Sequence, residues 1–335
     1  MPQAINAYRP LAAIAWDGFQ ARTQALATLL DGTAWHIRPR RNLTPLLPGR
    51  YVLDAVRTWR LLQEQQPRAV LVISPPVFAP LTAWLWAVSH RRPFVVDCHT
   101  GAFHGLKWRW SRIVHRLLFR DATAVLVHTE ADEELVRSWG IPGFLLPDDV
   151  PDPAQAAPRA RSSRPQVVVA GSFDGNEPVG VVLAAAAMLP EVEFRLTGDP
   201  RRVPPAVRER APANVTFTGW LAYPDFLGEL MAAHVVGVFS TDPNIMNRAA
   251  FEAVGLGRPL VLSDLAGLRR RFGEAAVMCP NEAGAMAAAL RQALQQQEGL
   301  ALRSAGLGPR LRAQHAGALA RLRVLLDGSL RTQPA

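Results

Sequence analysis

Short apolar runs alternate with helical segments along the chain, and this alternation constrains the fold more than any other sequence feature. The first run, Ala12–Ala15, leads into the turn Trp16-Asp17-Gly18 and then into the helical segment QARTQALATLL. A strand–helix–strand rhythm builds parallel sheets covered by helices. We therefore predict an α/β fold made of doubly wound, Rossmann-like domains. The predicted strands lie within residues 12–15, 69–76, 93–103, 122–129, 144–147, 166–173, 192–198, 214–220, 235–240, 260–264 and 275–280.

The alternation is interrupted between Asp148 and Pro165. This stretch, DDVPDPAQAAPRARSSRP, is rich in proline and small polar residues and has no apolar periodicity, as expected for a linker. We predict a first domain over residues 1–150, a linker over 151–165 and a second domain over 166–306. An amphipathic helix is predicted over residues 307–330. Two doubly wound domains predict a ligand cleft between the carboxyl ends of their sheets.

Composition bounds the class of protein. The chain has 335 residues, of which 49% are hydrophobic and 19% charged, so we expect a large packed core and exclude global disorder. Cys98 and Cys279 are far apart in sequence and predict buried free thiols in a reducing compartment, with a disulfide as the alternative.

The net charge of +9 comes almost entirely from arginine, and Lys107 is the only lysine. Because Lys107 is not in a Gly-Lys-Ser/Thr setting, a P-loop is excluded. The positive excess could serve an anionic nucleotide or a membrane surface, or it could reflect codon bias. No nucleic-acid-binding motif is present, so we predict no nucleic-acid partner.

No strongly apolar segment is long enough to cross a bilayer. The longest, Val77–Val88, has 12 residues, whereas a span needs roughly 20. Residues 1–16 also lack the charged and apolar regions of a signal peptide. We therefore expect a cytoplasmic protein, either soluble or peripheral at the inner face of the membrane.

The stretch from Ser240 to Asp264, STDPNIMNRAAFEAVGLGRPLVLSD, is the most informative for function. It predicts a polar loop, a short helix and a buried strand, with Gly255 and Gly257 ending the helix through positive φ. The free N–H groups at the start of such a helix favour a phosphate. Glu252 suits the two vicinal hydroxyls of a ribose; the alternative is an ordinary glutamate on the helix surface.

This stretch resembles the nucleotide-sugar-binding segment of the retaining family four glycosyltransferases, which have the GT-B fold. The pattern of that family is Glu-x7-Glu followed by Ala, Gly and Pro, and here Glu252 is followed by Gly257 and Pro259. The first Glu of the pair falls at Asn244, which departs from the pattern. The resemblance implies that Glu252 binds the donor ribose and that Asn244 lies at the donor sugar.

A glycine turn after the first strand of the second domain is a candidate phosphate site. Gly171 and Ser172 can offer backbone N–H groups there, and the resemblance places the donor diphosphate at this turn. The basic pair usual in the family is replaced by Asn176 and Glu177. Arg248, one turn before Glu252, is the candidate substitute cation, and a solvated arginine is the alternative.

Two further turns, RLTGDP and FTGW, resemble those that frame the base in this family. Gly198 and Gly219 allow close approach of the backbone, and the Trp220 ring offers a flat surface.

The best candidates in the first domain are Asp97 and His99, in the sequence DCHTG at the end of a predicted strand. The resemblance implies that a His here faces the donor sugar. The alternative is that Asp97 caps a turn and His99 packs in polar surroundings. Asp17 is a candidate acceptor contact, because an inverting reaction would need an Asp or His there as general base.

A basic helix with aromatic residues is predicted over Leu106–Arg120, LKWRWSRIVHRLLFR. It can lie on an anionic membrane surface, or it can be a domain-surface helix whose apolar side enters the core. The first reading would favour a lipid-linked acceptor. Its basic residues are Lys107, Arg109, Arg112, Arg116 and Arg120.

Taken together, the resemblance implies a transferase that moves a sugar from a nucleotide-sugar, bound by the second domain, to a hydroxyl of a glycan or lipid-linked acceptor on the first. It implies retention of configuration, a final helix that crosses back onto the first domain, and a role in polysaccharide, glycolipid or cell-surface glycan synthesis. No Asp-x-Asp sequence is present, so no metal or other cofactor is expected. Two alternatives stay open: a catalytically weak partner subunit, favoured by Asn244 and the missing basic pair, and a sugar-nucleotide epimerase of the same fold.

Overall fold

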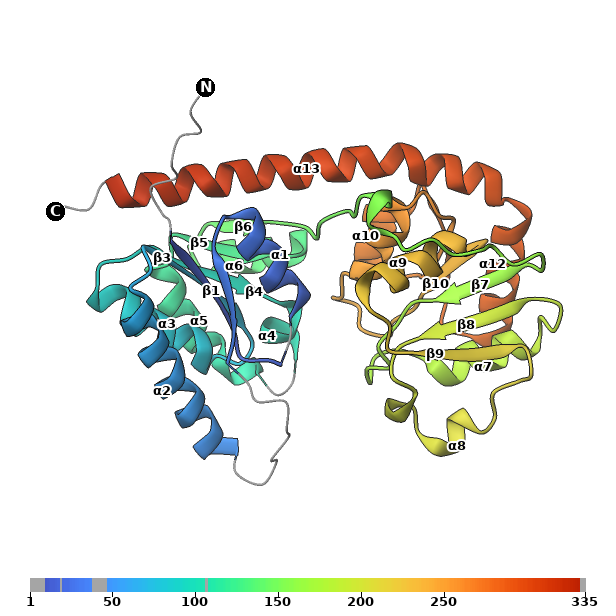
Figure 1. The fold of residues 1–335 in the computed structure, drawn as a ribbon, viewed down its shortest axis with the longest axis horizontal. Helices are drawn as coiled ribbons and strands as arrows, with labels where there is room; N and C mark the ends of the chain where they lie inside the picture. The colour runs from blue at the N-terminus through green and yellow to red at the C-terminus, as the bar shows by residue number, and fades with distance from the viewer. Residues whose placement is uncertain (1–9, 19, 38–46, 106–107, 332–335) are drawn as a thin grey trace. The chain divides into compact units, whose positions relative to one another are not determined.

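The computed structural model describes residues 10–18, 20–37, 47–105 and 108–331. Its contacts divide the chain into two compact units. The first holds residues Met1–Pro147 and His315–Ala335, and the second holds Asp148–Gln314. Each unit is an α/β structure with its own six-stranded sheet (Figure 1).

All strands of the first unit are parallel, in the order β2-β1-β3-β4-β5-β6. The order reverses direction between β1 and β3, where ligands bind in doubly wound sheets. The strands are β1 (Leu11–Ala15), β2 (Thr33–His36), β3 (Ala69–Ser74), β4 (Phe94–Cys98), β5 (Ala124–Val127) and β6 (Gly143–Leu145). The helices are α1 (Ala21–Leu29), α2 (Leu47–Gln65), α3 (Phe78–Ser89), α4 (Thr100–His104), η2 (Arg109–Ser111), α5 (Arg112–Arg120) and α6 (Glu130–Ser138).

The central strands β1, β3, β4 and β5 of the first sheet are buried at every position, because nearly all of their residues are apolar. Val70 and Val72 of β3 pack with Trp86 of α3, in a core that α2 and α5 also line. Leu71, between the two valines, packs on the opposite face with Leu26 of α1. This alternation explains why the strands read as continuous apolar runs rather than as period-two patterns.

The second unit has the parallel strand order β12-β11-β10-β7-β8-β9. Here the order reverses between β7 and β10. The strands are β7 (Gln166–Val169), β8 (Glu193–Thr197), β9 (Val215–Gly219), β10 (Val235–Val238), β11 (Leu260–Ser263) and β12 (Ala276–Cys279). The helices are η3 (Pro153–Gln155), α7 (Val179–Ala187), η4 (Pro200–Arg202), α8 (Pro205–Arg208), α9 (Tyr223–Ala232), α10 (Arg248–Gly255), α11 (Ala266–Phe272) and α12 (Ala283–Gln295).

Helices also cover both faces of the second sheet. One core joins alternate strand residues to α7 and α12, and the other joins the remaining ones to α9 and α10. Phe251 of α10 lies in the second core against Phe272, with their ring centroids 4.9 Å apart.

The long helix α13 (Gln297–Arg331) starts ten residues earlier than predicted, since the sequence indicated a helix over 307–330. Leu307 and Leu311 pack in a core of the second unit, whereas Leu319 and Leu322 pack in a core of the first. The helix therefore returns to the first unit, as the resemblance implied (Figure 1).

Two local predictions in the first unit were wrong. The segment after β4 is not a glycine turn, because Thr100–His104 form α4. The single helix predicted over Leu106–Arg120 is divided into η2 and α5. Leu106 and Lys107 lie outside the described residues.

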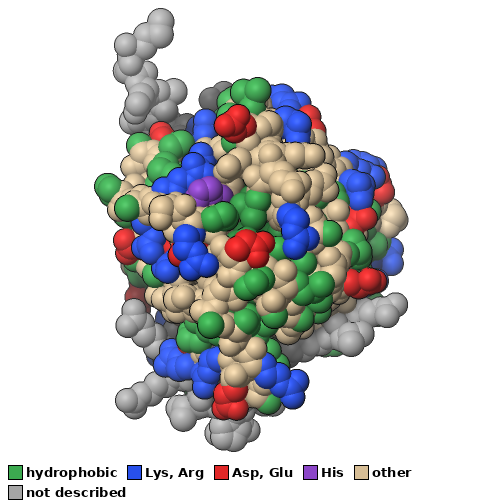
Figure 2. All heavy atoms as spheres, turned by 90° about the vertical axis from the view of Figure 1, so that its right-hand side faces the viewer, with side chains coloured by type: hydrophobic (Ala, Val, Ile, Leu, Met, Phe, Trp, Pro, Cys, Tyr) green, Lys and Arg blue, Asp and Glu red, His purple; other side chains and the backbone are tan. Residues whose placement is uncertain are grey.

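Charged side chains are mixed in sign on the face that Figure 2 shows, where basic and acidic groups are interspersed with hydrophobic ones. On this face the net charge of +9 does not form one continuous basic surface. Cys98 and Cys279 are both buried and free. None of the described helices is long and apolar enough to cross a membrane.

Candidate functional site

The first unit has a pocket where its strand order reverses, at the carboxyl ends of β1 and β3. Asp17 and Gln20, which follow β1, line it together with His99, which follows β4. Tyr51 and Trp108 add aromatic walls, with their ring centroids 6.1 Å apart. The fold thus brings the predicted residues Asp17 and His99 to one cavity. A polar floor between aromatic walls is suited to binding a sugar or another polyhydroxyl group.

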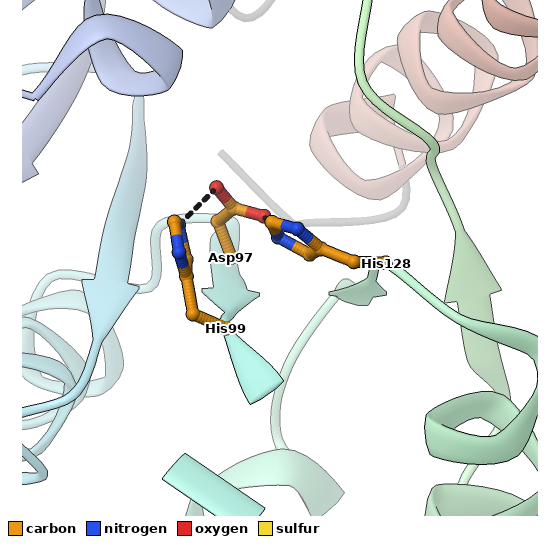
Figure 3. A group of neighbouring side chains, drawn as sticks. All are labelled: Asp97, His99 and His128. Carbon is orange, nitrogen blue, oxygen red and sulfur yellow. Dashed lines mark hydrogen bonds and ion pairs between the residues drawn. The ribbon is translucent and has the colours of Figure 1, made fainter. Parts of the chain in front are cut away.

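Asp97 lies beneath this pocket as the centre of a buried polar network. Its carboxylate is fully buried at the end of β4 and accepts two hydrogen bonds from Nε of Arg22, at 3.2 and 3.0 Å. His128 Nε2 lies 3.3 Å from one carboxylate oxygen, and His99 Nε2 lies 3.5 Å from the other. Figure 3 shows the carboxylate between the two imidazoles. Asp97 is therefore a buried hub rather than the cap of a turn.

The charges of this network fix the protonation of Asp97. Burial raises the pKa of the carboxyl, but Arg22 and the two imidazoles lower it by more, so the pKa lies well below its usual value. The pKa of His128 is lowered, first by burial and then by the charge of Arg22. An ionised carboxylate can only accept hydrogen bonds, so the facing Nε2 of His128 carries a hydrogen. Nδ1 of that ring is then the acceptor.

Asp97, His99 and His128 form the group in the described residues whose ligand atoms are close enough to hold a metal ion, all within 4.8 Å of one another. The same carboxylate is already paired with Arg22, and a fixed guanidinium beside it opposes a second cation. The donor set therefore fits a hydrogen-bonded network better than it fits a metal centre.

His128 was not among the predicted site residues, although a sequence signal for it exists. It directly follows β5, the neighbour of β4 in the sheet, and carboxyl ends of parallel strands meet at one edge. The neighbouring His104 pairs with a different carboxylate, since its Nε2 lies 2.8 Å from Asp132 Oδ1.

The second unit gathers its predicted glycine turns at the carboxyl edge of β7, β8 and β9. Gly198 and Gly219 have φ of 115° and 79° and form a backbone bridge, with Gly198 N donating to Gly219 O at 3.3 Å. A Cβ on Gly198 would lie 2.9 Å from the carbonyl oxygen of Gly171, so only glycine fits there. Trp220 is 73% exposed beside this edge. A flat ring beside open backbone is suited to stacking with a planar base.

Glu252 is buried in α10, which rules out the alternative of an ordinary surface glutamate. Arg248 Nε donates to Glu252 Oε1 at 2.9 Å, and Arg248 also contacts the Tyr223 hydroxyl. Burial raises the pKa of Glu252, and the charge of Arg248 partly offsets this. Burial lowers the pKa of Arg248, but the charges of Glu252 and Asp148 and the hydrogen bond with Tyr223 together raise it above its usual value. Arg248 is thus ion-paired and not a solvated arginine.

The helix boundary at this site differs in one respect from the prediction. Gly257 has a φ of 64°, as expected, but Gly255 is the last helical residue, without positive φ. Its lack of a side chain matters for packing, because a Cβ there would lie 2.7 Å from Val150. At the other end, Asn247 is the N-cap residue; its side chain makes no capping hydrogen bond, and its carbonyl oxygen accepts from Ala250 N at 3.1 Å.

Three further predicted residues of the donor site make hydrogen bonds within the second unit. Gly171 N donates to Thr197 Oγ1 at 3.1 Å, and Ser172 N donates to the carboxylate of Glu177. Asn244 N donates to Asp242 Oδ1 at 3.0 Å in the loop before α10.

Comparison with known families follows the same division into two parts. Residues 164–296 match the model described as glycosyl transferases group 1, and residues 20–144 match the glycosyl transferase 4-like domain. Two parallel-sheet units with a long returning helix define the GT-B class of glycosyltransferases. The chain belongs to this class, as a glycosyltransferase with group 1 and 4-like domains. No curated protein matches the sequence.

Solved structures agree on the fold. Sucrose-phosphate synthase from Thermosynechococcus elongatus superposes with a TM-score of 0.78 at 16% identity, covering 97% of this chain and 100% of that one. A glycosyltransferase from Rickettsia africae gives 0.71 at 12% identity, covering 98% and 100%. HepE of Anabaena, solved in complex with UDP and glucose, gives 0.68 at 15% identity, covering 96% and 99%.

Proposed function

We propose that this glycosyltransferase takes its sugar from a nucleotide-sugar bound on the second unit, with Glu252 as the ligand of the ribose. The observation that carries the proposal is the burial of the Glu252 carboxylate in α10. A buried carboxylate needs hydrogen-bond partners, and Glu252 accepts from Arg248 Nε and from the Tyr223 hydroxyl. Each carboxylate oxygen can accept more than one hydrogen bond. Vicinal hydroxyls of a ribose are matched donors for such a group.

The surrounding turns support a complete donor site. Gly219 leaves open space for a base next to Trp220, and the start of α10, where the N-cap side chain makes no capping hydrogen bond, is suited to a phosphate. Arg248 supplies a positive charge that helps the leaving phosphate without a metal ion. We therefore propose that no metal or other cofactor takes part. HepE, whose structure holds UDP and glucose, makes UDP-glucose the first donor to test.

The acceptor hydroxyl is proposed to bind in the pocket of the first unit. His99 and Asp17 line that pocket and offer hydrogen-bonding groups for a glycan or lipid-linked hydroxyl. Asp97 contacts His99 and can hold its ring in place. Because the Asp97 carboxylate is buried and paired with Arg22, we assign it as a positioning residue rather than a nucleophile. The family resemblance supports retention of configuration at the transferred sugar. The acceptor class is consistent with polysaccharide, glycolipid or cell-surface glycan synthesis.

A membrane surface is proposed as a second partner, through the helix layer α2, α3 and α5 that covers one face of the first sheet. These helices pack against the same core and against one another. Their outer side carries large exposed apolar residues: Val52, Leu53, Val56, Leu85, Val88, Ile113 and Leu117. Arg116 and Arg120 are exposed on α5. Exposed apolar residues beside arginines favour an anionic lipid surface.

Nucleotide binding tests the donor proposal. Purified protein is titrated calorimetrically with UDP, GDP, ADP, TDP and CMP, and the same is done with Glu252→Ala. We expect one nucleotide to bind and the variant to bind it roughly 100-fold more weakly, because the hydrogen bonds that the ribose hydroxyls donate to a charged carboxylate are lost.

Glu229→Gln is the matched control. Glu229 is also buried and ion-paired, with Arg195 at 2.6 Å, but it lies on α9, and its described partners Arg195 and Arg159 are outside the glycine turns. It should lose stability and keep nucleotide affinity. If no nucleotide binds at millimolar concentration, or if both variants lose binding equally, the donor site is wrong and the partner-subunit alternative gains. Donor turnover without any acceptor would instead favour the epimerase.

A further inference from the structure

The turn after β7 holds a carboxylate of the chain itself where an anion would bind. Ser172 N lies 3.1 Å from both carboxylate oxygens of Glu177, and Phe173 N donates to Oε2 at 2.8 Å. Ser172 Oγ adds a contact of 3.3 Å to Oε1. Successive backbone N–H groups that converge on one point form a nest, which binds phosphates in many proteins.

The backbone of the turn is built around this contact. Phe173 has a φ of 59°, which a non-glycine residue rarely adopts. A Cβ on Gly171 would lie 2.4 Å from Glu177 Oε2, so the glycine makes room for the carboxylate. Burial raises the pKa of Glu177, and the two backbone N–H groups oppose that rise. The hydrogen bonds of the turn thus stabilise the negative charge of Glu177, although burial removes part of its hydration.

The location gives this contact a functional meaning. The turn lies where the second sheet reverses its strand order, between β7 and β10. Asn176 of the same turn donates from Nδ2 to Ser240 Oγ at 3.1 Å, and its carbonyl oxygen accepts from Thr241 N at 2.7 Å. Those two residues begin the loop that leads to α10. The carboxylate therefore lies in the region of the sheet that is suited to a donor phosphate.

We propose that Glu177 is a specificity-determining residue that competes with a ligand phosphate for the Ser172 and Phe173 amides. A phosphate reaches these amides only when the Glu177 side chain leaves them. Glu177 thereby weakens binding of any ligand that relies on phosphate contacts alone and favours ligands that also bind elsewhere in the unit. This inference rests on the proposed donor site for its biological role, but the competition itself is a property of the turn.

Inorganic pyrophosphate is the probe, because it needs neither a base nor a ribose site. Its affinity for the full chain is measured by calorimetry at pH 7.5 for the wild type, Glu177→Ala and Glu177→Gln. We expect Glu177→Ala to bind pyrophosphate at least tenfold more tightly than the wild type. Glu177→Gln removes the charge but keeps an acceptor on the amides, so it should fall between the two and also serves if the alanine variant does not fold.

Asp174→Asn is the matched control. Asp174 is exposed in the same turn, pairs with Arg202 and accepts from Ser172 Oγ at 2.7 Å. Its replacement by asparagine changes the net charge equally and keeps an acceptor for that hydroxyl, while Glu177 still covers the two amides. Its affinity for pyrophosphate should stay within threefold of the wild type. The proposal is overturned if no Glu177 variant gains affinity, or if Asp174→Asn gains as much.

The nucleotide titrations separate the two proposals. If Glu177→Ala gains pyrophosphate affinity while no nucleotide binds to any variant, the competition holds and the donor site fails. If a nucleotide binds in a Glu252-dependent way while the Glu177 variants bind pyrophosphate as the wild type does, only the role of Glu177 falls.

Discussion

Replacing Asp97 by asparagine should destabilise the first unit strongly, because it removes a buried carboxylate that forms an ion pair with a buried guanidinium. Asp97 is fully buried and Arg22 is 5% exposed. In the Asp97→Asn variant Arg22 still donates to the carbonyl oxygens of Leu146 and Pro147, at 2.8 and 3.4 Å, but these neutral groups do not replace the charge of Asp97. Removing one member of a buried ion pair costs about 3–5 kcal/mol in the free energy of unfolding.

The assay is urea unfolding at pH 7, followed by tryptophan fluorescence and circular dichroism. The double variant Arg22→Met/Asp97→Asn removes both charges and should recover most of the loss, since no unpaired charge remains buried. A single-variant loss below about 1 kcal/mol would refute the reasoning, because the ion pair would then contribute little. A double variant no more stable than the single one would show that packing, and not charge, sets the cost.

The pH dependence of this pair has a definite sign. The folded pKa of Asp97 is depressed below its ordinary value of 3.8, so the carboxylate stabilises the fold fully above that value. The stabilisation is lost as the pH falls from 3.8 through the lower folded pKa. The destabilising effect of Asp97→Asn should therefore shrink in strong acid and stay constant between pH 5 and 8.

Two further predictions concern the same unit. Burial lowers the pKa of His115 from 6.5 to about 4, and its Nε2 lies 2.8 Å from Ser74 Oγ. The contribution of this group to stability is therefore complete above pH 6.5 and is lost as the pH falls, so the free energy of unfolding should drop by about 2 kcal/mol between pH 7 and pH 5. In urea titrations the His115→Gln variant should lack this part of the drop. An unchanged pH dependence in the variant would contradict this. The double variant Ile113→Ser/Leu117→Ser should sediment with anionic phosphatidylglycerol vesicles about tenfold less than the wild type. The control variant Leu302→Ser, which changes an exposed leucine on α13, should sediment like the wild type. Equal effects of both changes, or no binding by the wild type, would contradict the membrane proposal.

The strands were predictable because each is a short apolar run between turns, and this pattern needs no tertiary information. The exception was β2, whose residues Thr33–His36 are partly exposed and only weakly apolar. The start of α13 was missed for a related reason. Its buried positions before Leu307 are Leu300 and the polar Ser304, whereas the apolar Leu302 is exposed, so the amphipathic pattern is weak there.

Site residues that directly follow strands were also predictable. Asp17, His99 and Gly171 each lie just after a strand, and parallel strands bring such positions to one edge. The sequence could not show which of these positions face one another, because strand order is set by packing. His128 was missed for this reason, since its meeting with Asp97 depends on β5 lying next to β4.

By itself the sequence determined the α/β class, the two-part organisation and the family motif around Glu252, because these depend on local periodicity and on spacing along the chain. Only the tertiary structure decided how the charges are distributed among partners. Glu252 is paired with Arg248, Asp97 with Arg22, and the Ser172 amide with Glu177. A carboxylate takes whichever donors the packed backbone places within about 3 Å of it, and that distance is fixed by the fold rather than by sequence separation.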